Sequence, residues 1–510
     1  MVKTSLHRNV AAVIAALLSF IAIAEINFFI GLIAFVPLFA SLMTASLKQS
    51  IKTGLIFGAT FSCFAYSWMI SGAERFTGHN FLYGTGVFLI STLFVSIYWS
   101  AILFCFSLLK KSLHSVGAVM YNSLVAAALF CLFEFLLSFV AQGFPWFSFF
   151  TGNAFAENLF AIQPASFFGV YILTFILVAV NYLFAAFIVQ KQWKQLLIPV
   201  AAIIIYMACG YLIYSNFNAN LTGNKRIKIA VLNENIPPDI KWDDANGNML
   251  VQRLLDLNKN ATLQKPDIIL WSESAIPWTY KKDDDLVNEI LKESAAANAT
   301  HILGMNTEVE GNTVNNSAYC ILPDGNVAGR YDKQFLLSLI EKPIGSLNIP
   351  FFSSKGFFVS KDAAHGQPLQ TPYGKAGIMI CNETTCAQSA AKASGSGAEF
   401  LCNMSNDGWF SNTFIVRNHF YTVRLRAVEA RKDVVINCNN GYAGSISANG
   451  DIINQQRNIE PFVTMETIHP NNYTSMATRS PFLLVYVCAG FILFVIAEKK
   501  FRKKNRYRNN

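Results

Sequence analysis

The stretch that decides the fold is GIMICNE, residues 377–383, in which an apolar run ends at a cysteine and then a carboxylate. Short apolar runs containing β-branched residues are typical of buried strands. In open α/β sheets, functional groups gather beyond the carboxyl ends of the strands. Cys381 therefore stands where a strand would present a nucleophile, although a cysteine in such a run is more often inert packing.

The sequence on both sides of this stretch alternates between short apolar runs and amphipathic segments, which is typical of a layered α/β domain. We assign residues 216–480 to one water-soluble insert, with Asp324-Gly325 as a hairpin turn. Strands are predicted at 227–232, 267–271, 301–304, 316–322, 376–381 and 400–404, with a final hairpin of 434–437 and 444–447. Helices are predicted at 244–262, 284–298, 385–394 and 414–431.

The remainder of the chain is unusually apolar. Of 510 residues, 53% are hydrophobic and only 14% are charged, against roughly a quarter charged in soluble domains. A membrane-spanning helix needs about 17–25 apolar residues. We therefore predict a bundle of seven spans in residues 1–215 and an eighth span with a basic cytoplasmic tail in 481–510. The predicted spans are 10–24, 26–43, 51–72, 82–109, 115–140, 167–189, 195–215 and 481–497.

The orientation of these spans follows from lysine and arginine in the short connections, which favour the cytoplasmic side. With eight spans, every basic connection falls on one side and the insert 216–480 falls on the other. The net charge of +9 owes much to these anchors, so we expect no nucleic-acid partner. The anchors are Lys3, Arg8, Lys48, Lys52, Lys110, Lys111, Lys191, Lys194 and the tail after 498.

No cofactor and no metal are expected. The sequence has no phosphate-binding or dinucleotide-binding glycine motif, and no Cys/His spacing typical of a zinc site. Five of the ten cysteines lie in predicted spans and five in the insert, so at least one cysteine of the insert is unpaired.

Two further residues of the insert could make Cys381 reactive. Glu273 follows the strand 267–271, and Lys333 follows the hairpin. A carboxylate can take the thiol proton, and an ammonium can stabilise a thiolate and then an oxyanion. The seven histidines have no motif context, which argues weakly against a Cys–His pair. Each of the three residues, taken alone, is more often structural.

The order Glu273, Lys333, Cys381 resembles the Glu–Lys–Cys triad of the nitrilase, or carbon–nitrogen hydrolase, superfamily. Together with the predicted spans, the chain resembles the membrane branch of that superfamily, the apolipoprotein N-acyltransferases. Matching segments lie in both halves of the chain: 143–146 (GFPW), 163–166 (QPAS), 169–171 (GVY), 235–237 (NIP), 241–243 (KWD), 316–317 (NS), 406–410 (NDGWF), 424–429 (RLRAVE) and 439–441 (NNG).

The resemblance implies an αββα sandwich for the insert, beside the helical membrane bundle. It implies a bacterial inner-membrane, multi-pass enzyme with its catalytic domain on the periplasmic side. The enzyme would transfer an acyl chain from a phospholipid to the α-amino group of a diacylglyceryl-modified apolipoprotein, through a thioester on Cys381. The implied supporting residues are Glu341, Glu383, Tyr331 and Asn316. The candidate substrate-binding residues are Trp242, Trp409 and Asn382, and for the two tryptophans ordinary aromatic core is an equal alternative.

Two departures from the family pattern bear on the site. Residues 334–341 keep Glu341 at the family spacing but lack the Pro-Phe-Gly turn that usually precedes it, so the shape of this loop is expected to differ. Asn382 replaces an aromatic residue that commonly follows the nucleophile, so the preferred acyl donor is expected to differ as well.

Three alternatives accompany this interpretation. Glu134 lies within a predicted span, where a carboxylate is a functional candidate, but its place near a helix end favours a satisfied structural group. The protein could instead be a membrane-anchored amidase or nitrilase acting on a small C–N substrate, although a tether needs only one span. A transporter is the third possibility, but the spans contain few ionisable groups.

Overall fold

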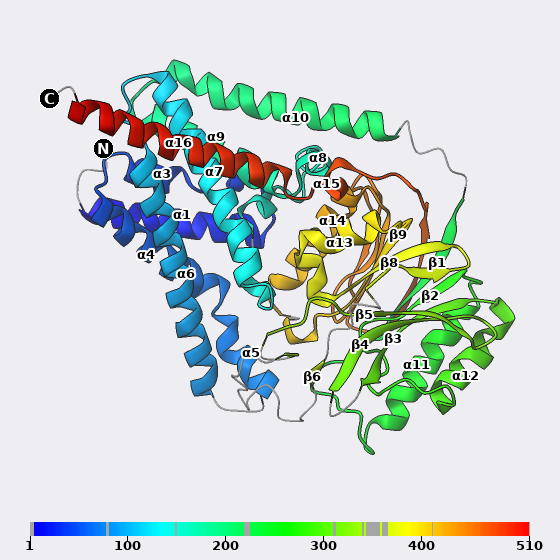
Figure 1. The fold of residues 1–510 in the computed structure, drawn as a ribbon. Coiled ribbons are helices and arrows are strands. Elements are labelled where there is room, and N and C mark those ends of the chain that lie inside the picture. Colours follow the sequence, from blue (N-terminus) through cyan, green and yellow to red (C-terminus); the bar gives the residue numbers. More distant parts are fainter. Residues whose placement is uncertain are drawn as a thin grey trace.

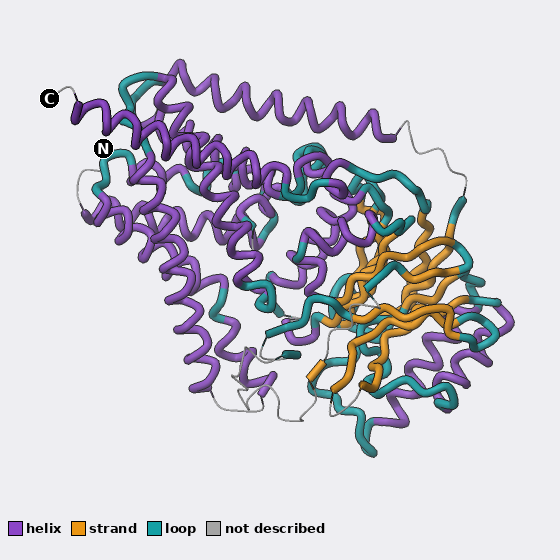
Figure 2. The backbone as a smooth tube through the Cα atoms, in the orientation of Figure 1, coloured by secondary structure: helices purple, strands orange, loops and turns teal. Residues whose placement is uncertain are grey.

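The computed structural model describes residues 5–77, 81–147, 150–218, 225–309, 313–338, 341–342, 358–359, 366–410 and 412–508. A bundle of long helices lies beside a sandwich of two β-sheets that carries helices on its outer faces (Figure 1). Figure 2 shows the strands gathered at one end of the molecule and the long helices at the other.

Within the described residues, five helical segments are long and apolar enough to cross a bilayer. They are Ser5–Ala24 (α1), Phe81–Leu109 (α6), Val116–Val140 (α7), Tyr171–Val189 (α9) and the stretch Trp193–Phe217, which contains most of α10 (Leu197–Asn218). The closing helix α16 (Leu483–Arg508) packs its buried Cys488 and Val485 into the same core as α7. The apolar helical region is therefore as expected, while the total of eight spans stays a prediction.

Two of the predicted spans are interrupted in the structure. The segment 26–43 forms two short helices, α2 (Phe28–Gly31) and α3 (Val36–Leu42). The Asn27 side chain caps the start of α2, and Pro37 lies in the first turn of α3, where a new helix begins. The segment 51–72 is divided between α4 (Leu47–Ala65) and α5 (Trp68–Thr77). Ser46 and Gln49 form a capping box that begins α4 four residues before the predicted span.

The sandwich consists of two mixed sheets. The first has the strand order β13 (Phe462–Ile468), β1 (Ile227–Asn233), β2 (Ile268–Leu270), β3 (Thr300–Val309), β4 (Thr313–Ile321) and β5 (Val327–Asp332), and β6 (Phe358–Val359) also pairs with β4. The second has the order β12 (Ile452–Gln456), β11 (Ala443–Ile446), β10 (Val434–Asn439), β9 (Phe400–Asn406), β8 (Gly374–Ile380) and β7 (Leu369–Thr371). Strands β1–β2–β3 and β8–β9–β10 run parallel, so their carboxyl ends lie together.

Alternation along the strands explains the layers. On β1, Ile229 and Val231 face the second sheet, where they share a core with Ile378 on β8. The intervening Ala230 and Leu232 face the helices of the first sheet. Those helices are α11 (Gly247–Thr262) and α12 (Asp285–Ser294), and the second sheet carries α13 (Ala387–Gly395) and α14 (Ile415–Ala430). The order helix, sheet, sheet, helix is the layering that the resemblance implied.

The helical region and the sandwich share a continuous interface. Residues of α14, such as Phe420 and Val428, belong to the same buried apolar cluster as α1, α7 and α9. Buried polar groups also connect the two regions, since the Arg424 guanidinium donates to the Ala156 carbonyl over 3.0 Å. The Val170 N–H donates to Glu429 over 2.6 Å. The short helices at this junction are η1 (Pro145–Phe147), η2 (Thr151–Phe155), α8 (Ala165–Phe168) and α15 (Met476–Arg479).

Candidate active site

The carboxyl end of β8 presents Cys381 in an unusual backbone conformation. The buried strand ends at Ile380, and Cys381 begins the turn η6 (Cys381–Thr385) with φ +51°. A positive φ is uncommon for a residue with a side chain, and such conformations concentrate at functional sites. The turn is braced by Glu383, whose carboxylate accepts the Ile380 N–H over 2.7 Å.

Glu273 reaches the same region from the opposite sheet. It follows β2 in a turn where Ser274 has φ +50°. Its Oε1 accepts a hydrogen bond from Asn316 Nδ2 at 2.8 Å and contacts Lys333 Nζ at 3.2 Å. Asn316 lies on β4, and its backbone carbonyl accepts the Lys333 N–H over 2.9 Å. Asn316 thus fixes both the carboxylate and the backbone of the lysine.

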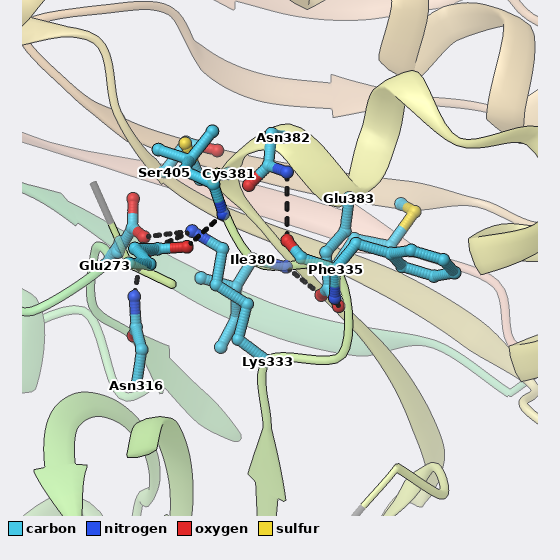
Figure 3. A network of polar contacts seen from close by, with 12 residues as sticks. Glu273, Asn316, Lys333, Phe335, Ile380, Cys381, Asn382, Glu383 and Ser405 are labelled. Atoms are coloured by element: carbon cyan, nitrogen blue, oxygen red, sulfur yellow. Dashed lines mark hydrogen bonds and ion pairs between the residues drawn. The ribbon is translucent and has the colours of Figure 1, made fainter. Parts of the chain in front are cut away.

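Lys333 lies at the centre of the site, with a fully buried side chain just after β5. Its Nζ bridges Glu273 at 3.2 Å and Glu341 at 2.9 Å. Burial alone would lower the pKa of Lys333, but Glu273, Glu341 and Cys381 together hold it well above its usual value. Figure 3 shows Glu273, Asn316 and Lys333 gathered beside Cys381. The structure therefore brings the three predicted triad residues together.

The electrostatics of this cluster favour a thiol that is activated by a base. Burial raises the pKa of Cys381 well above its usual value, and the Glu273 carboxylate raises it further, while Lys333 opposes both. The resting sulfur is therefore protonated beside a carboxylate. Such an arrangement suits proton transfer to the carboxylate at the moment of attack, rather than a preformed thiolate.

Glu383 and Tyr331 form a second buried group beside the turn that begins at Cys381. Tyr331 donates its hydroxyl to Glu383 over 3.0 Å, and the Gln334 N–H donates to the same carboxylate over 2.6 Å. Burial raises the pKa of Glu383 to about 7, against the opposing effect of these donors. Because Glu383 also holds Ile380, it ties the chain after Lys333 to the chain before Cys381.

The altered loop after Lys333 is anchored at two points. Glu341 Oε2 accepts the Leu337 N–H over 2.7 Å, so this carboxylate fixes both the loop and the ammonium. The Ser338 N–H donates to the Gly143 carbonyl over 2.8 Å, which joins the loop to the helical region. Residues 339–340 and 343–357 lie outside the described part of the chain.

A cavity of about 550 Å³, partly open to solvent, lies over Cys381. Its apolar wall combines Pro145 and Trp146 of the helical region with Phe410 and Ile415 of the sandwich. Its polar wall contains Asn382, Thr385, Asp407, Asn418, His419 and Thr422. The Asn382 amide donates to the Phe335 carbonyl over 2.9 Å, which fixes this candidate substrate-binding residue at the rim.

The structure describes the side chain of only one of the two tryptophans that are candidate substrate-binding residues. Trp242 packs against Trp278, with ring centroids 5.3 Å apart, beside the core under α11 and α12. That placement favours the packing alternative for Trp242. The side chain of Trp409 lies outside what the structure describes. Trp146 lines the cavity instead, and the segment 143–146 that contains it was the sequence signal available for it.

Glu134 lies in the helical region, where it is fully hydrogen-bonded by neutral groups. Its carboxylate accepts the Thr151 N–H and the Thr174 hydroxyl, both over 2.7 Å. It lines a separate cavity among aromatic side chains, including Tyr66 and Trp99. These bonds favour the structural interpretation of Glu134.

Similar proteins were found by sequence. Two family models match the chain, one for the apolipoprotein N-acyltransferase N-terminal domain over residues 15–183 and one for carbon-nitrogen hydrolase over residues 228–476. The apolipoprotein N-acyltransferase of Haemophilus ducreyi is 28% identical over 396 residues, covering 72% of this chain and 75% of that protein. The protein of the same name from Photobacterium profundum is 23% identical over 498 residues, covering 93% and 92%.

Solved structures were also matched. The carbon-nitrogen hydrolase from Helicobacter pylori G27 aligns with a TM-score of 0.37 and 15% identity, covering 51% of this chain and 94% of that chain. The two family models together run from the first long helix through the sandwich, in the order expected of a single enzyme. The chain therefore belongs to the apolipoprotein N-acyltransferase family, and its catalytic half is a carbon–nitrogen hydrolase domain.

Proposed function

We propose that this enzyme transfers an acyl chain from a phospholipid to the α-amino group of the N-terminal diacylglyceryl-cysteine of lipoproteins, through a thioester on Cys381. The relatives are named apolipoprotein N-acyltransferases, which supports the acylation of lipoproteins. The observation that carries the mechanism is the buried Lys333, bridged between Glu273 and Glu341 beside Cys381.

In the first half-reaction, Glu273 takes the proton of the Cys381 thiol while the sulfur attacks the ester carbonyl of the phospholipid. Lys333 stabilises the oxyanion of the tetrahedral intermediate. The carbon–oxygen ester bond then breaks, and the proton on Glu273 passes to the departing alkoxide. The products are a lysophospholipid and an acyl thioester on Cys381.

In the second half-reaction, the amine of the acceptor attacks the thioester carbonyl and gives a proton to Glu273. Lys333 again stabilises the oxyanion. When the carbon–sulfur bond breaks, Glu273 returns the proton to the sulfur, so the product amide and the free thiol are formed. One base and one cation therefore serve both steps. Because the lysophospholipid leaves before the acceptor reacts with the covalent intermediate, the mechanism predicts ping-pong kinetics.

The position of the site suits substrates that lie in a bilayer. Moving each CH₂ of an acyl chain into water costs about 0.8 kcal/mol, so the chain must pass directly from the membrane to the site. The cavity over Cys381 has one wall from the apolar helical region and one from the sandwich. We propose that the helices lie in the bacterial inner membrane with the sandwich on the periplasmic side.

The test is mass spectrometry of the Cys381 peptide after the full-length enzyme meets phospholipid vesicles without an acceptor. We expect one added acyl group on Cys381. The Cys381→Ala variant should carry none, while Cys209→Ala, which removes an exposed cysteine on α10, should leave the adduct unchanged. An acyl group on another residue, or free fatty acid with no adduct, would refute the thioester.

A further inference from the structure

His419 on α14 lies in the wall of the cavity that contains Cys381, although the mechanism above does not use it. Its side chain is 10% exposed. Nδ1 lies 2.9 Å from Asp407 Oδ1 and 3.1 Å from Oδ2, while Nε2 lies 3.5 Å from Ser405 Oγ. The ring also contacts the backbone of Cys381. Both nitrogens therefore face groups able to accept a hydrogen bond.

Asp407 places a negative charge beside Cys381, and a positive charge on His419 would offset it. It follows β9, and its N–H donates to the Asn439 carbonyl over 2.9 Å, which fixes it at the carboxyl end of the parallel strands. Its buried carboxylate faces Cys381 and raises the pKa of that thiol. An unpaired Asp407 would therefore oppose the ionisation of Cys381.

We propose that His419 is a positioning residue, present as an imidazolium, which neutralises Asp407 and braces the left-handed turn at Cys381. This proposal rests on Cys381 as the nucleophile of the proposed function. The His419–Asp407 pair, on the α14 side of the turn, then complements the Glu273–Lys333 pair on the other side. The sulfur then loses its proton with less opposition in the first half-reaction.

The groups around the ring support a charged imidazole. Burial would lower the pKa of His419, but Asp407 raises it, and Glu273 and the Cys381 backbone add to that effect, so it lies above its ordinary value. Cys438 on β10 lies close to both Asp407 and His419. Burial raises the pKa of this thiol well above its usual value, so it brings no competing charge. As pH rises through the pKa of His419, the compensation of Asp407 is lost.

The test measures the rate of alkylation of Cys381 by iodoacetamide as a function of pH, followed on the Cys381 peptide. We expect His419→Gln to slow alkylation about tenfold at neutral pH and below, which corresponds to about 1 pH unit in the pKa of the thiol, and we expect the two rates to converge as pH rises above the pKa of His419. The double variant Asp407→Asn/His419→Gln removes both charges, and its rate should return to within about threefold of the wild type. A distant histidine–aspartate pair offers a matched control, since His469 lies 3.6 Å from Asp433, and His469→Gln should leave the profile unchanged.

An unchanged profile in His419→Gln, or a loss that Asp407→Asn does not reverse, would overturn the proposal. If His419→Gln fails to fold, Asp407→Asn alone decides the question. It should stay within about threefold of the wild type, because without the Asp407 charge no compensating charge on His419 is needed, and a tenfold loss would contradict charge compensation. Because alkylation needs no acyl donor, failure here is distinct from failure of the acylation experiment above.

Discussion

The helical region and the sandwich bury polar side chains in different ways. In the helical region, buried polar side chains form hydrogen bonds with uncharged partners. Glu134 accepts from Thr151 and Thr174. The Asn181 amide donates to the Gly31 carbonyl over 2.9 Å. In the sandwich, opposite charges are packed around one thiol, with Lys333 between two carboxylates. Neutral bonds fix a scaffold, whereas paired charges set the protonation state of the thiol that we propose as the nucleophile. The helical region thus supplies a cavity wall, and the sandwich supplies the chemistry.

The strongest test of this contrast removes the base. Glu273→Gln keeps the shape of the side chain but cannot take the thiol proton, so acylation of Cys381 should fall by about 10²–10⁴-fold. The measurement is the single-turnover rate of adduct formation on phospholipid vesicles. Glu289→Gln is the control, because it neutralises a carboxylate in an exposed ion pair with Lys292. Acylation within tenfold of the wild type would show that another group is the base.

The next test disturbs the link between the two regions. A methyl group at Gly143 would lie 2.7 Å from Ser338 Cβ and would overlap the Ser338 hydroxyl, displacing the loop that holds Glu341. We expect Gly143→Ala to slow acylation about 10–100-fold, since misplacement of about 1 Å can cost that much. Gly86→Ala is the matched control, because its new methyl group meets no atom of the described residues within 4 Å. Equal acylation rates in the two variants would show that the position of this loop does not affect the reaction.

A third test uses a buried carboxyl of the sandwich that has no cation partner among the described residues. Glu234 accepts the Ser272 N–H over 3.2 Å, and burial raises its pKa from 4.5 to about 7. A folded-state pKa above the unfolded value contributes stability that is complete below about pH 4.5 and is lost as pH rises to about 7.

Glu234→Gln should remove that pH dependence and should be more stable than the wild type at pH 8, by roughly 1–3 kcal/mol. The measurement is the thermal midpoint in detergent at pH 5 and pH 8. The wild type should lose more than the variant between these values. A variant that loses as much as the wild type would show that Glu234 is ionised at both pH values.

The smallest effect is expected in the helical region. Glu134→Gln keeps one acceptor oxygen and replaces the other with an N–H donor, so stability should fall by about 1 kcal/mol. The rate of Cys381 acylation should change by less than about threefold, which is under 1 kcal/mol in barrier height. A loss of tenfold or more would give Glu134 a role in the chemistry and would remove the distinction between the two regions.

Much of the sandwich was predictable from the sequence because its strands are short, buried and bounded by turns. The strands β1, β8 and β9 fall within two residues of their predicted bounds. β12 and β13 were missed, since their polar and charged residues, such as Gln455 and Glu466, hide the apolar pattern. The spans 26–43 and 51–72 were predicted as unbroken because composition does not reveal that α2 ends at Gly31 or that α4 ends at Ala65.

The residues of the candidate site that follow strands were predictable, whereas those brought in by packing between distant segments were not. Glu273 and Cys381 each follow an apolar strand, and parallel strands gather such residues at one edge. The pairing of His419 with Asp407 depends instead on how α14 packs against the turn at Cys381, and no spacing in the sequence reveals it. The cavity wall from Trp146 likewise exists only once the helical region meets the sandwich.

The most direct measurement is a two-step transfer on the full-length enzyme. Vesicles with an isotope-labelled acyl chain load the enzyme, the vesicles are removed, and a diacylglyceryl-cysteine peptide is then added. We expect the label to leave Cys381 and to appear as an amide on the peptide's amino terminus in equal amount. Label that leaves Cys381 as free fatty acid, or reaches the peptide without ever residing on Cys381, would contradict it.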